Sequence, residues 1–389
     1  MSTEYTNNHY VPQWYQKRFI PSGQVDRELF LLDLKPDSFR TPDGVKRRRK
    51  AMRRIGTRKC FAIDDLYTTR FEGVESRELE QVFFGEVDLQ GKKAVEFFAT
   101  YDHDRLEERA LEHMMVYMST QKLRTPKGLD WLVATSGAQD RSHVLDHLET
   151  LRTVYGAIWS ECAWQVADAS HSPTKFIISD HPVTVYNRAC APGHPWCKGV
   201  NDPDIRLQAT HTLFPLSAER VLILTNMLWA CNPHRPPLEL RPNPEFFRGA
   251  MFDFTELQVR RSLTEAEVLT INCIVKKRAY RFIAAGREEW LHPERRIKFS
   301  WRTAGDHHLL MPDPRSLHPG AEISMAYTGG RTEAMDTFGR RPGHHRFGHE
   351  AHDRNEAVAH NQWCQEFEAL FGPQPRGLAL QHVSRARAA

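Results

Sequence analysis

The chain has 389 residues, of which 40% are hydrophobic and 26% are charged, and its net formal charge is +4. These values are typical of a globular protein of one large or two ordinary domains, and they exclude a polycation that binds nucleic acid over its whole surface. The seven scattered cysteines exclude a disulfide framework and favour a reducing compartment. The polar leader and the lack of any apolar stretch near 18 residues predict a soluble cytoplasmic protein of bacterial type, without a signal peptide or a membrane span.

The opening segment, residues 8–20, contains a histidine, four aromatic residues, two glutamines and a basic pair. Because a disordered leader would leave too many large apolar groups in water, we expect this segment to dock into the fold. We expect a short helix over residues 9–20, with Pro12 in its first turn. A strand is predicted over residues 28–34, and a basic block follows at residues 46–59.

Long amphipathic segments follow the basic block. Apolar residues recur at helical spacing over residues 76–100 and 104–122. We expect Gly91 to divide the first segment into two helices and residues 125–128 to end the second. A further helix is predicted near residues 140–154.

Beyond residue 155 the pattern changes to short strands. Five segments have strand character: 158–166, 176–180, 183–186, 213–216 and 221–224. Thr264 and Glu267 form a capping-box pattern that opens a predicted helix over residues 264–284. From about residue 296 the composition shifts to Pro, Gly, His and Arg, with one helix expected near residues 355–371.

The order of these segments predicts an α+β protein rather than an alternating α/β protein. We expect a mainly helical N-terminal half packed on a small, mostly antiparallel β unit, with an irregular C-terminal extension. The predicted core domain is residues 1–295, helical over 1–155 and β-rich over 156–295. Residues 296–389 are the predicted extension.

Several sequence blocks, taken in order, resemble a known family. They are residues 9–13 (HYVPQ) with Phe19, 64–68 (DDLYT), Leu79 to Gly91, 121–126 (QKLRTP), 178–183 (ISDHPV), 214–217 (FPLS) and 310–315 (LMPDPR). The chain thereby resembles a bacterial domain family of unknown function, number four thousand two hundred and thirty-eight. The resemblance spans most of the chain, and it implies no activity.

The polar residues near these blocks are the candidate catalytic residues: His9, Gln13, Glu80, Glu86 and Asp180. Histidine and carboxylates at one pocket would bind a divalent metal or act as general acid and base. We expect Glu80 and Asp180 to hold such an ion, Mg²⁺ or Mn²⁺. The alternative is that these are ion-paired helix residues around a buried His9. Asp180, at the end of an apolar strand, has its own structural alternative as a turn residue.

Two groups of basic residues are candidate substrate contacts. Arg18 and Arg124 are expected to bind an anionic group beside the carboxylates. In the basic block, nine of fourteen residues are Lys or Arg, and Arg47, Arg48, Arg53 and Arg54 are expected to contact phosphates. The block lacks interleaved aromatic residues, which does not favour base stacking. The alternative is a solvated loop or helix whose charges pair with acidic neighbours.

Two further clusters are weaker candidates for metal binding. Cys190, His194 and Cys197 have a spacing that is not standard for zinc. The histidines of the C-terminal region, residues 344, 345, 349, 352 and 360, lack the HExxH arrangement. The sequence also lacks a GxSxG elbow and a glycine-rich phosphate loop.

Two functions remain open from the sequence, beside a third possibility of a scaffold protein whose C-terminal tail recruits a partner. The first is metal-assisted hydrolysis of a phosphodiester by a nuclease-like protein, with phage defence as an analogy. The second is a non-catalytic module that binds nucleic acid or another protein. Whether the chain is an enzyme is left undecided.

Overall fold

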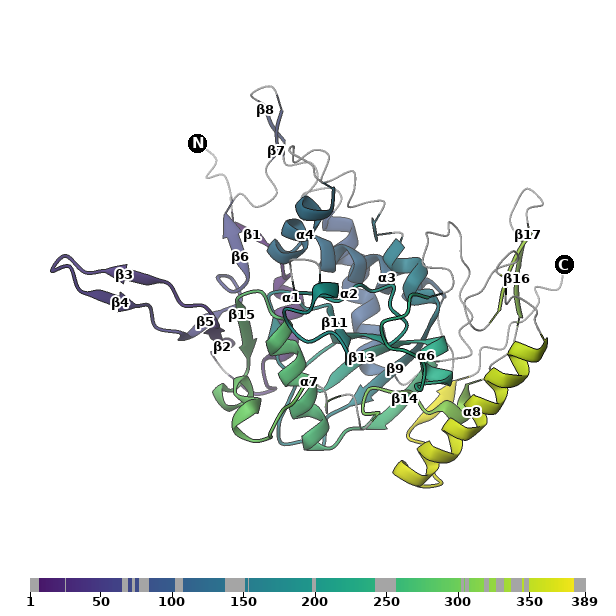
Figure 1. Ribbon diagram of the computed structural model, residues 1–389. Helices are drawn as coiled ribbons and strands as arrows, with labels where there is room; N and C mark the ends of the chain where they lie inside the picture. Colours follow the sequence, from purple (N-terminus) through teal and green to yellow (C-terminus); the bar gives the residue numbers. More distant parts are fainter. Residues whose placement is uncertain are drawn as a thin grey trace.

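The computed structural model of the protein combines helices with strands in several sheets (Figure 1). It describes residues 7–24, 26–64, 69–71, 74–76, 84–101, 108–136, 151–152, 154–197, 201–241, 257–301, 304, 308–317, 322–326, 332–336, 345 and 350–380. The helices are α1 (Gln13–Gln16), α2 (Gly85–Thr100), α3 (Glu108–Leu123), α4 (Pro126–Ser136), α6 (Met227–Cys231), α7 (Glu265–Arg278) and α8 (Glu350–Phe371). None of the helices in these ranges is long and apolar enough to cross a membrane.

The strands fall into sheets of two, four and six members. They are β1 (Asn7–His9), β2 (Glu28–Asp33), β3 (Ser38–Arg40), β4 (Lys46–Arg48), β5 (Met52–Gly56), β6 (Ala62–Asp64), β7 (Thr69–Phe71), β8 (Val74–Ser76), β9 (Cys162–Asp168), β10 (Ile178–Ser179), β11 (Thr184–Asn187), β12 (Thr210–Pro215), β13 (Arg220–Asn226), β14 (Leu257–Ser262), β15 (Phe282–Ala285), β16 (Glu322–Ala326), β17 (Thr332–Asp336) and β18 (Leu378–Leu380).

The largest sheet has the strand order β11-β12-β13-β9-β14-β18. All its pairs are antiparallel except β14 with β9, which run parallel with an irregularity between Gln258 and Arg261. Strand β12 is buried along its whole length and β13 along all but its first residue, as expected where both faces of a sheet are covered. Helix α2 contacts β13, helix α6 contacts β9 and β13, and helix α7 contacts β10 and β11.

The four-stranded sheet has the order β10-β15-β2-β5. Strands β2 and β5 continue outward into β3 and β4, which pair only with each other and extend away from the body of the molecule (Figure 1). This sheet therefore anchors a hairpin to the core.

The opening segment is docked into the core, as the sequence predicts. Tyr15 and Phe19 have no exposed surface, and Tyr15 stacks on Phe214 with ring centroids 5.4 Å apart. A short helix is present, formed by α1 and a 3₁₀ turn over Lys17–Phe19, but it is shorter than predicted: His9 belongs to β1, and Pro12 precedes the first turn as the N-cap.

Gly91 does not divide a helix, contrary to the sequence prediction. Helix α2 runs without a break from Gly85 to Thr100. A Cβ at Gly91 would lie 2.4 Å from the Tyr117 ring, so this glycine allows α2 and α3 to approach closely. The predicted helix over 264–284 begins with the expected capping box at Thr264, but it ends at Arg278 and is followed by β15.

The protein is α+β, as the sequence predicts. The predicted distribution of helices and strands along the chain was wrong. The N-terminal half is not mainly helical, because β1–β8 lie within residues 7–76 and α1 is the one α-helix described among them, before α2 begins at Gly85. The basic block has no regular apolar repeat at helical or strand spacing. It forms strands because its residues pair with neighbouring strands. The β unit is not small, since one sheet alone has six strands.

The C-terminal extension is also more regular than predicted. Helix α8 includes the expected helix at 355–371 and buries Trp363 and Phe367 in a cluster with Trp229. Strand β18 joins the main sheet at the edge of β14. The predicted helix near 140–154 lies largely outside the described residues, and the domain boundary at 295 stays a prediction.

Candidate functional site

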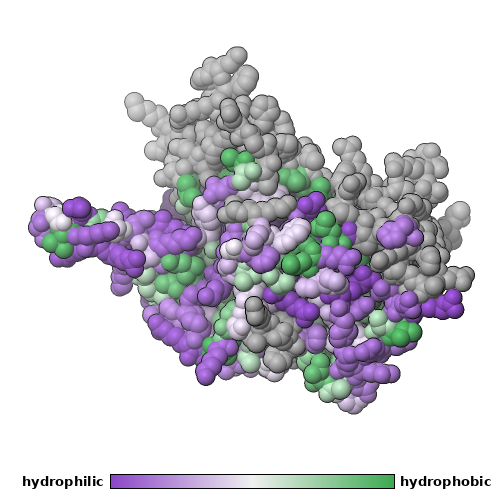
Figure 2. Space-filling model, viewed as in Figure 1, coloured by the Kyte–Doolittle hydropathy of each residue, from purple (hydrophilic) through white to green (hydrophobic). Residues whose placement is uncertain are grey.

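The hairpin of β3 and β4, with residues 38–50 here called the arm, is exposed along both of its strands. Its two strands pair in the register Ser38 with Arg48, Phe39 with Arg47, and Arg40 with Lys46. A tight turn closes the tip, where Gly44 adopts φ +82° and donates its N–H to the Thr41 carbonyl oxygen at 2.8 Å. Figure 2 shows the arm as a mostly hydrophilic projection.

The charge of the arm is strongly positive. It carries one acidic residue, Asp43, and six basic residues. The basic residues are Arg40, Lys46, Arg47, Arg48, Arg49 and Lys50, and all are exposed. Within the described part of the chain, none of these six side chains forms an ion pair.

The root of the arm is held by one arginine. Arg281, just before β15, donates from Nε and Nη2 to the Asp33 carboxylate at 2.9–3.2 Å and from Nη2 to Asp37 at 2.7 Å. Burial alone would raise the pKa of Asp33, but the Arg281 hydrogen bonds and charge outweigh it and hold that pKa below its usual value. Arg281 thereby offsets one of the two negative charges at the root of the arm.

Asp180 fixes the turn that presents Arg281. Its carboxylate accepts the backbone N–H groups of Tyr280, Arg281 and Phe282 at 2.9, 2.6 and 2.7 Å. Asp180 is only 2% exposed, and burial raises the pKa of its carboxyl group despite these three hydrogen bonds. Asp180 therefore connects the core to the arm through the backbone of Arg281.

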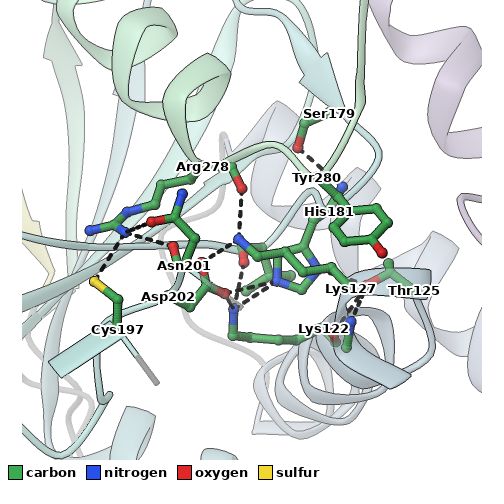
Figure 3. Close-up of polar contacts among 12 residues, drawn as sticks. Lys122, Thr125, Lys127, Ser179, His181, Cys197, Asn201, Asp202, Arg278 and Tyr280 are labelled. Carbon is green, nitrogen blue, oxygen red and sulfur yellow. Dashed lines mark hydrogen bonds and ion pairs between the residues drawn. The ribbon is translucent and has the colours of Figure 1, made fainter. Parts of the chain in front are cut away.

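Behind this turn lies a buried cluster of charged residues (Figure 3). The Asp202 carboxylate accepts from Lys122 Nζ at 2.7 Å on one oxygen and from Lys127 Nζ at 2.6 Å on the other. Lys127 also donates to the Arg278 carbonyl oxygen at 2.7 Å. His181 Nε2 lies 2.9 Å from Lys122 Nζ and 3.1 Å from the Asp202 carboxylate.

The protonation of this cluster follows from its burial. Burial, together with the positive charge of Lys122, lowers the pKa of His181 to about 3, so the ring is neutral. Burial lowers the pKa of Lys122 to about 8, although Asp202 opposes that shift. A protonated Lys122 donates to the bare Nε2 of His181, which leaves the ring proton on Nδ1, 2.6 Å from the Thr125 hydroxyl.

A short turn brings the two lysines together. Lys122 lies in the last turn of α3 and Lys127 in the first turn of α4, where Pro126 occupies the first helical position. A Cβ at Gly128 would lie 2.3 Å from the Lys122 carbonyl oxygen, so only glycine permits this turn. Both lysines, the histidine and the aspartate are bonded within the cluster. The cluster thereby connects α3 and α4 to the loops after β10 and β11.

The N-terminal candidate residues bond mainly to backbone. His9 Nε2 lies 3.0 Å from the Arg58 carbonyl oxygen, and Arg18 Nε donates to the Leu216 carbonyl oxygen at 2.8 Å. The Gln13 amide oxygen accepts from the Thr57 hydroxyl at 3.5 Å. These contacts join the opening segment to the neighbouring strands.

The helix candidates lie in a second network. Arg124 donates to Gln121 at 2.8 Å and to Asp88 at 2.8 Å. Glu86 accepts from Gln90 one helical turn away. Glu80 lies outside the described residues, so the predicted metal pair of Glu80 with Asp180 stays a prediction.

The basic candidates divide into two groups. Arg47 and Arg48 belong to the arm. Arg54, on β5, forms ion pairs with Asp26 and Glu28, and Arg53 beside it is exposed. The phosphate contacts expected of these four residues stay a prediction.

No group of three or more His, Cys, Asp or Glu residues is positioned to hold a metal ion within the described ranges. In the Cys190–Cys197 segment, the His194 Nδ1 accepts from the Trp196 backbone N–H at 3.2 Å. In the C-terminal region, His360 Nε2 lies 2.8 Å from the Pro314 carbonyl oxygen, and residues 344 and 349 are outside the described residues.

A small cavity lies beside the main sheet. It measures about 10 Å³, and its lining includes Tyr186, Arg188, His211, Trp229 and His308. This volume corresponds to about one water molecule. The cavity as described has no room for a substrate.

Sequence reasoning missed the hairpin and the residues at its root. The dipeptide Asp43-Gly44 between two short segments is a hairpin signal and predicts a turn at the observed place. Arg281 and Asp202 have no comparable local signal, because their partners are distant in sequence.

Residues 148–289 match the sequence model of a family described as "Protein of unknown function (DUF4238)". The match covers less than half of the chain, and it confirms the predicted resemblance over these residues. It includes Asp180, Asp202 and Arg281, whereas the HYVPQ block and the arm lie before it. No curated protein and no solved structure matches the chain.

Proposed function

We propose that this protein binds nucleic acid through the arm. The observation that carries the proposal is the set of six exposed basic side chains on a projecting hairpin, with no ion pair to any of them in the described part of the chain. Cations that are not already paired are free to replace the counterions of a phosphate backbone, and release of those counterions drives association.

The shape of the arm supports the same proposal. The hairpin extends from the body, so a nucleic acid reaches its basic residues without contacting most of the remaining surface (Figure 1). Net charge over the whole chain is only +4, so attraction is concentrated at the arm rather than spread over the molecule. The expected role is therefore contact at one defined place.

The proposal does not include a reaction. The carboxylate of Asp180 is engaged by three backbone N–H groups, and Glu80 is outside the described residues. Metal-assisted hydrolysis thus stays a prediction from the sequence, and the binding role stands without it.

The test is a salt titration of binding to a fluorescent nucleic acid. The arm variant Arg40→Gln, Lys46→Gln, Arg48→Gln removes three charges from one face of the hairpin. If each contacts one phosphate, the slope of log K against log salt becomes shallower by about 2.7, at about 0.9 per contact on B-form DNA.

The matched control removes three exposed charges elsewhere. Lys92, Lys93 and Arg109 lie on α2 and α3 and are exposed, so their replacement by Gln changes net charge equally. We expect the control to keep the wild-type slope. Equal losses in both variants would contradict an arm-specific site, and unchanged binding in the arm variant would overturn the proposal.

A further inference from the structure

We infer that the arm recognises the major groove of B-form double-stranded DNA. This inference rests on the proposed nucleic-acid binding and names the class of nucleic acid. It is argued from the different chemistry of the two faces of the hairpin and from its two-stranded form.

The pairing register divides the arm into two chemically distinct faces. Cross-strand partners share a face, and residues two positions apart along a strand share that face as well. Arg40, Lys46 and Arg48 therefore lie on one face. Phe39 and Arg47 lie on the other, together with Val45, which precedes Arg47 by two residues.

The second face leaves apolar surface exposed. Phe39 is 44% exposed and Val45 is 49% exposed. A hairpin that served only to attract phosphates would gain nothing from these two side chains. Their burial against a ligand removes apolar area from water, so the ligand has an apolar component within reach of a basic side chain.

Duplex DNA offers that combination in its major groove. The floor of the groove presents thymine methyl groups for apolar contact and guanine O6 and N7 for an arginine, while phosphates line its walls. Phe39 and Val45 would meet the methyl groups, Arg47 would meet base acceptors, and the long side chains of the opposite face would reach the flanking phosphates.

The two-stranded form of the arm fits some nucleic acids better than others. A two-stranded ribbon fits the major groove of B-form DNA, about 12 Å wide, whereas the minor groove is about 6 Å wide. The major groove of A-form RNA is too deep and narrow for side chains to read. Binding to single strands relies on stacking along a series of aromatic rings, and the arm has one ring, Phe39.

The experiment compares four fluorescent probes with the full-length chain at about 150 mM salt. They are a 20-base-pair DNA duplex, the same duplex with uracil for thymine, the RNA duplex of the same sequence, and one DNA strand. We expect at least tenfold tighter binding to the DNA duplex than to RNA or the single strand. Uracil removes only the major-groove methyl groups, and we expect it to weaken binding about threefold or more.

A second variant tests the apolar face itself. Phe39→Ser with Val45→Ser should abolish the difference between the thymine and uracil duplexes and leave RNA binding unchanged. The control Leu89→Ser replaces an apolar side chain that is 52% exposed on α2, and it should behave like the wild type. Both substitutions are at exposed positions, so folding is expected to be retained.

The outcomes separate the two proposals. Equal binding to DNA and RNA with no effect of uracil overturns the major-groove inference and leaves nucleic-acid binding standing. Tighter binding to the single strand also overturns it. No binding to any probe overturns both.

Discussion

Arg281 donates its backbone N–H to the Asp180 carboxylate at 2.6 Å, and the same residue's side chain holds Asp33 and Asp37 at the root of the arm. Beside the strands β2 and β5 that continue into the hairpin, Arg281 thus adds a connection between the core and the root of the arm. An aspartate that the sequence suggested as catalytic supports the orientation of the basic arm.

Replacement of Arg281 should weaken the arm at its root. Arg281→Gln leaves the carboxylate of Asp33, whose side chain is 8% exposed, without its paired cation, and we expect a loss of about 1–2 kcal/mol of stability. Hydrogen exchange at the Arg49 amide, which donates to the Asp37 carbonyl oxygen at 2.8 Å, should become faster. Arg287→Gln is the control, because Arg287 is exposed and pairs with Glu289 at 3.7 Å. Unchanged exchange at Arg49 would show that the root does not depend on Arg281.

Replacement of Asp180 should destabilise the whole protein. Asp180→Ala leaves three buried N–H groups without an acceptor, and we expect a loss of about 3 kcal/mol or more in urea unfolding. Asp180→Asn keeps one acceptor oxygen and should lose less. Wild-type stability in Asp180→Ala would mean that the turn does not need the carboxylate and would restore its candidacy as a functional group.

Asp202 should be the most sensitive residue of the buried cluster. Asp202→Asn leaves the ammonium groups of Lys122 and Lys127 buried beside a neutral amide, and removal of one partner from such a set costs about 3–5 kcal/mol. Lys122→Met should cost less, because Lys127 still pairs with Asp202. Equilibrium unfolding in urea checks the order, and the reverse order would contradict the assigned pairing.

Acid should destabilise the protein through its buried histidines. Burial lowers the pKa of both His181 and His211 to about 3, against an ordinary value of 6.5. Between these pH values the unfolded chain binds protons that the native protein does not, so stability falls as pH falls from about 6.5 toward 3. Urea unfolding at a series of pH values should show this decline. His181→Asn should make the decline shallower, and His345→Asn, at an exposed position, should leave it unchanged.

The sequence predicts most of the secondary structure where local pattern decides it. The capping box of Thr264 and Glu267 predicts the start of α7. The apolar run at residues 221–224 predicts β13. The arm was missed because a basic run has no apolar period, so its pairing rather than its own pattern makes it a hairpin.

The candidate site was less predictable for a related reason. Asp33 and Arg281 are separated by 248 positions, and Lys127 and Asp202 by 75. No local spacing links such residues, and only the completed sheets bring them together. The sequence suggested Asp180 as a catalytic residue, whereas its observed function as an acceptor for a distant turn depends on the strand pairing between β10 and β15.

Strand β18 gives the main sheet an edge that is completed late. Strand β14 pairs with β9 on one side and with residues 378–380 on the other, more than one hundred positions further along the chain. During synthesis the edge of β14 that faces away from β9 stays unpaired until residues 378–380 emerge. An uncovered strand edge is a template for pairing with other chains, so loss of the C-terminal strand would favour aggregation of an otherwise folded core.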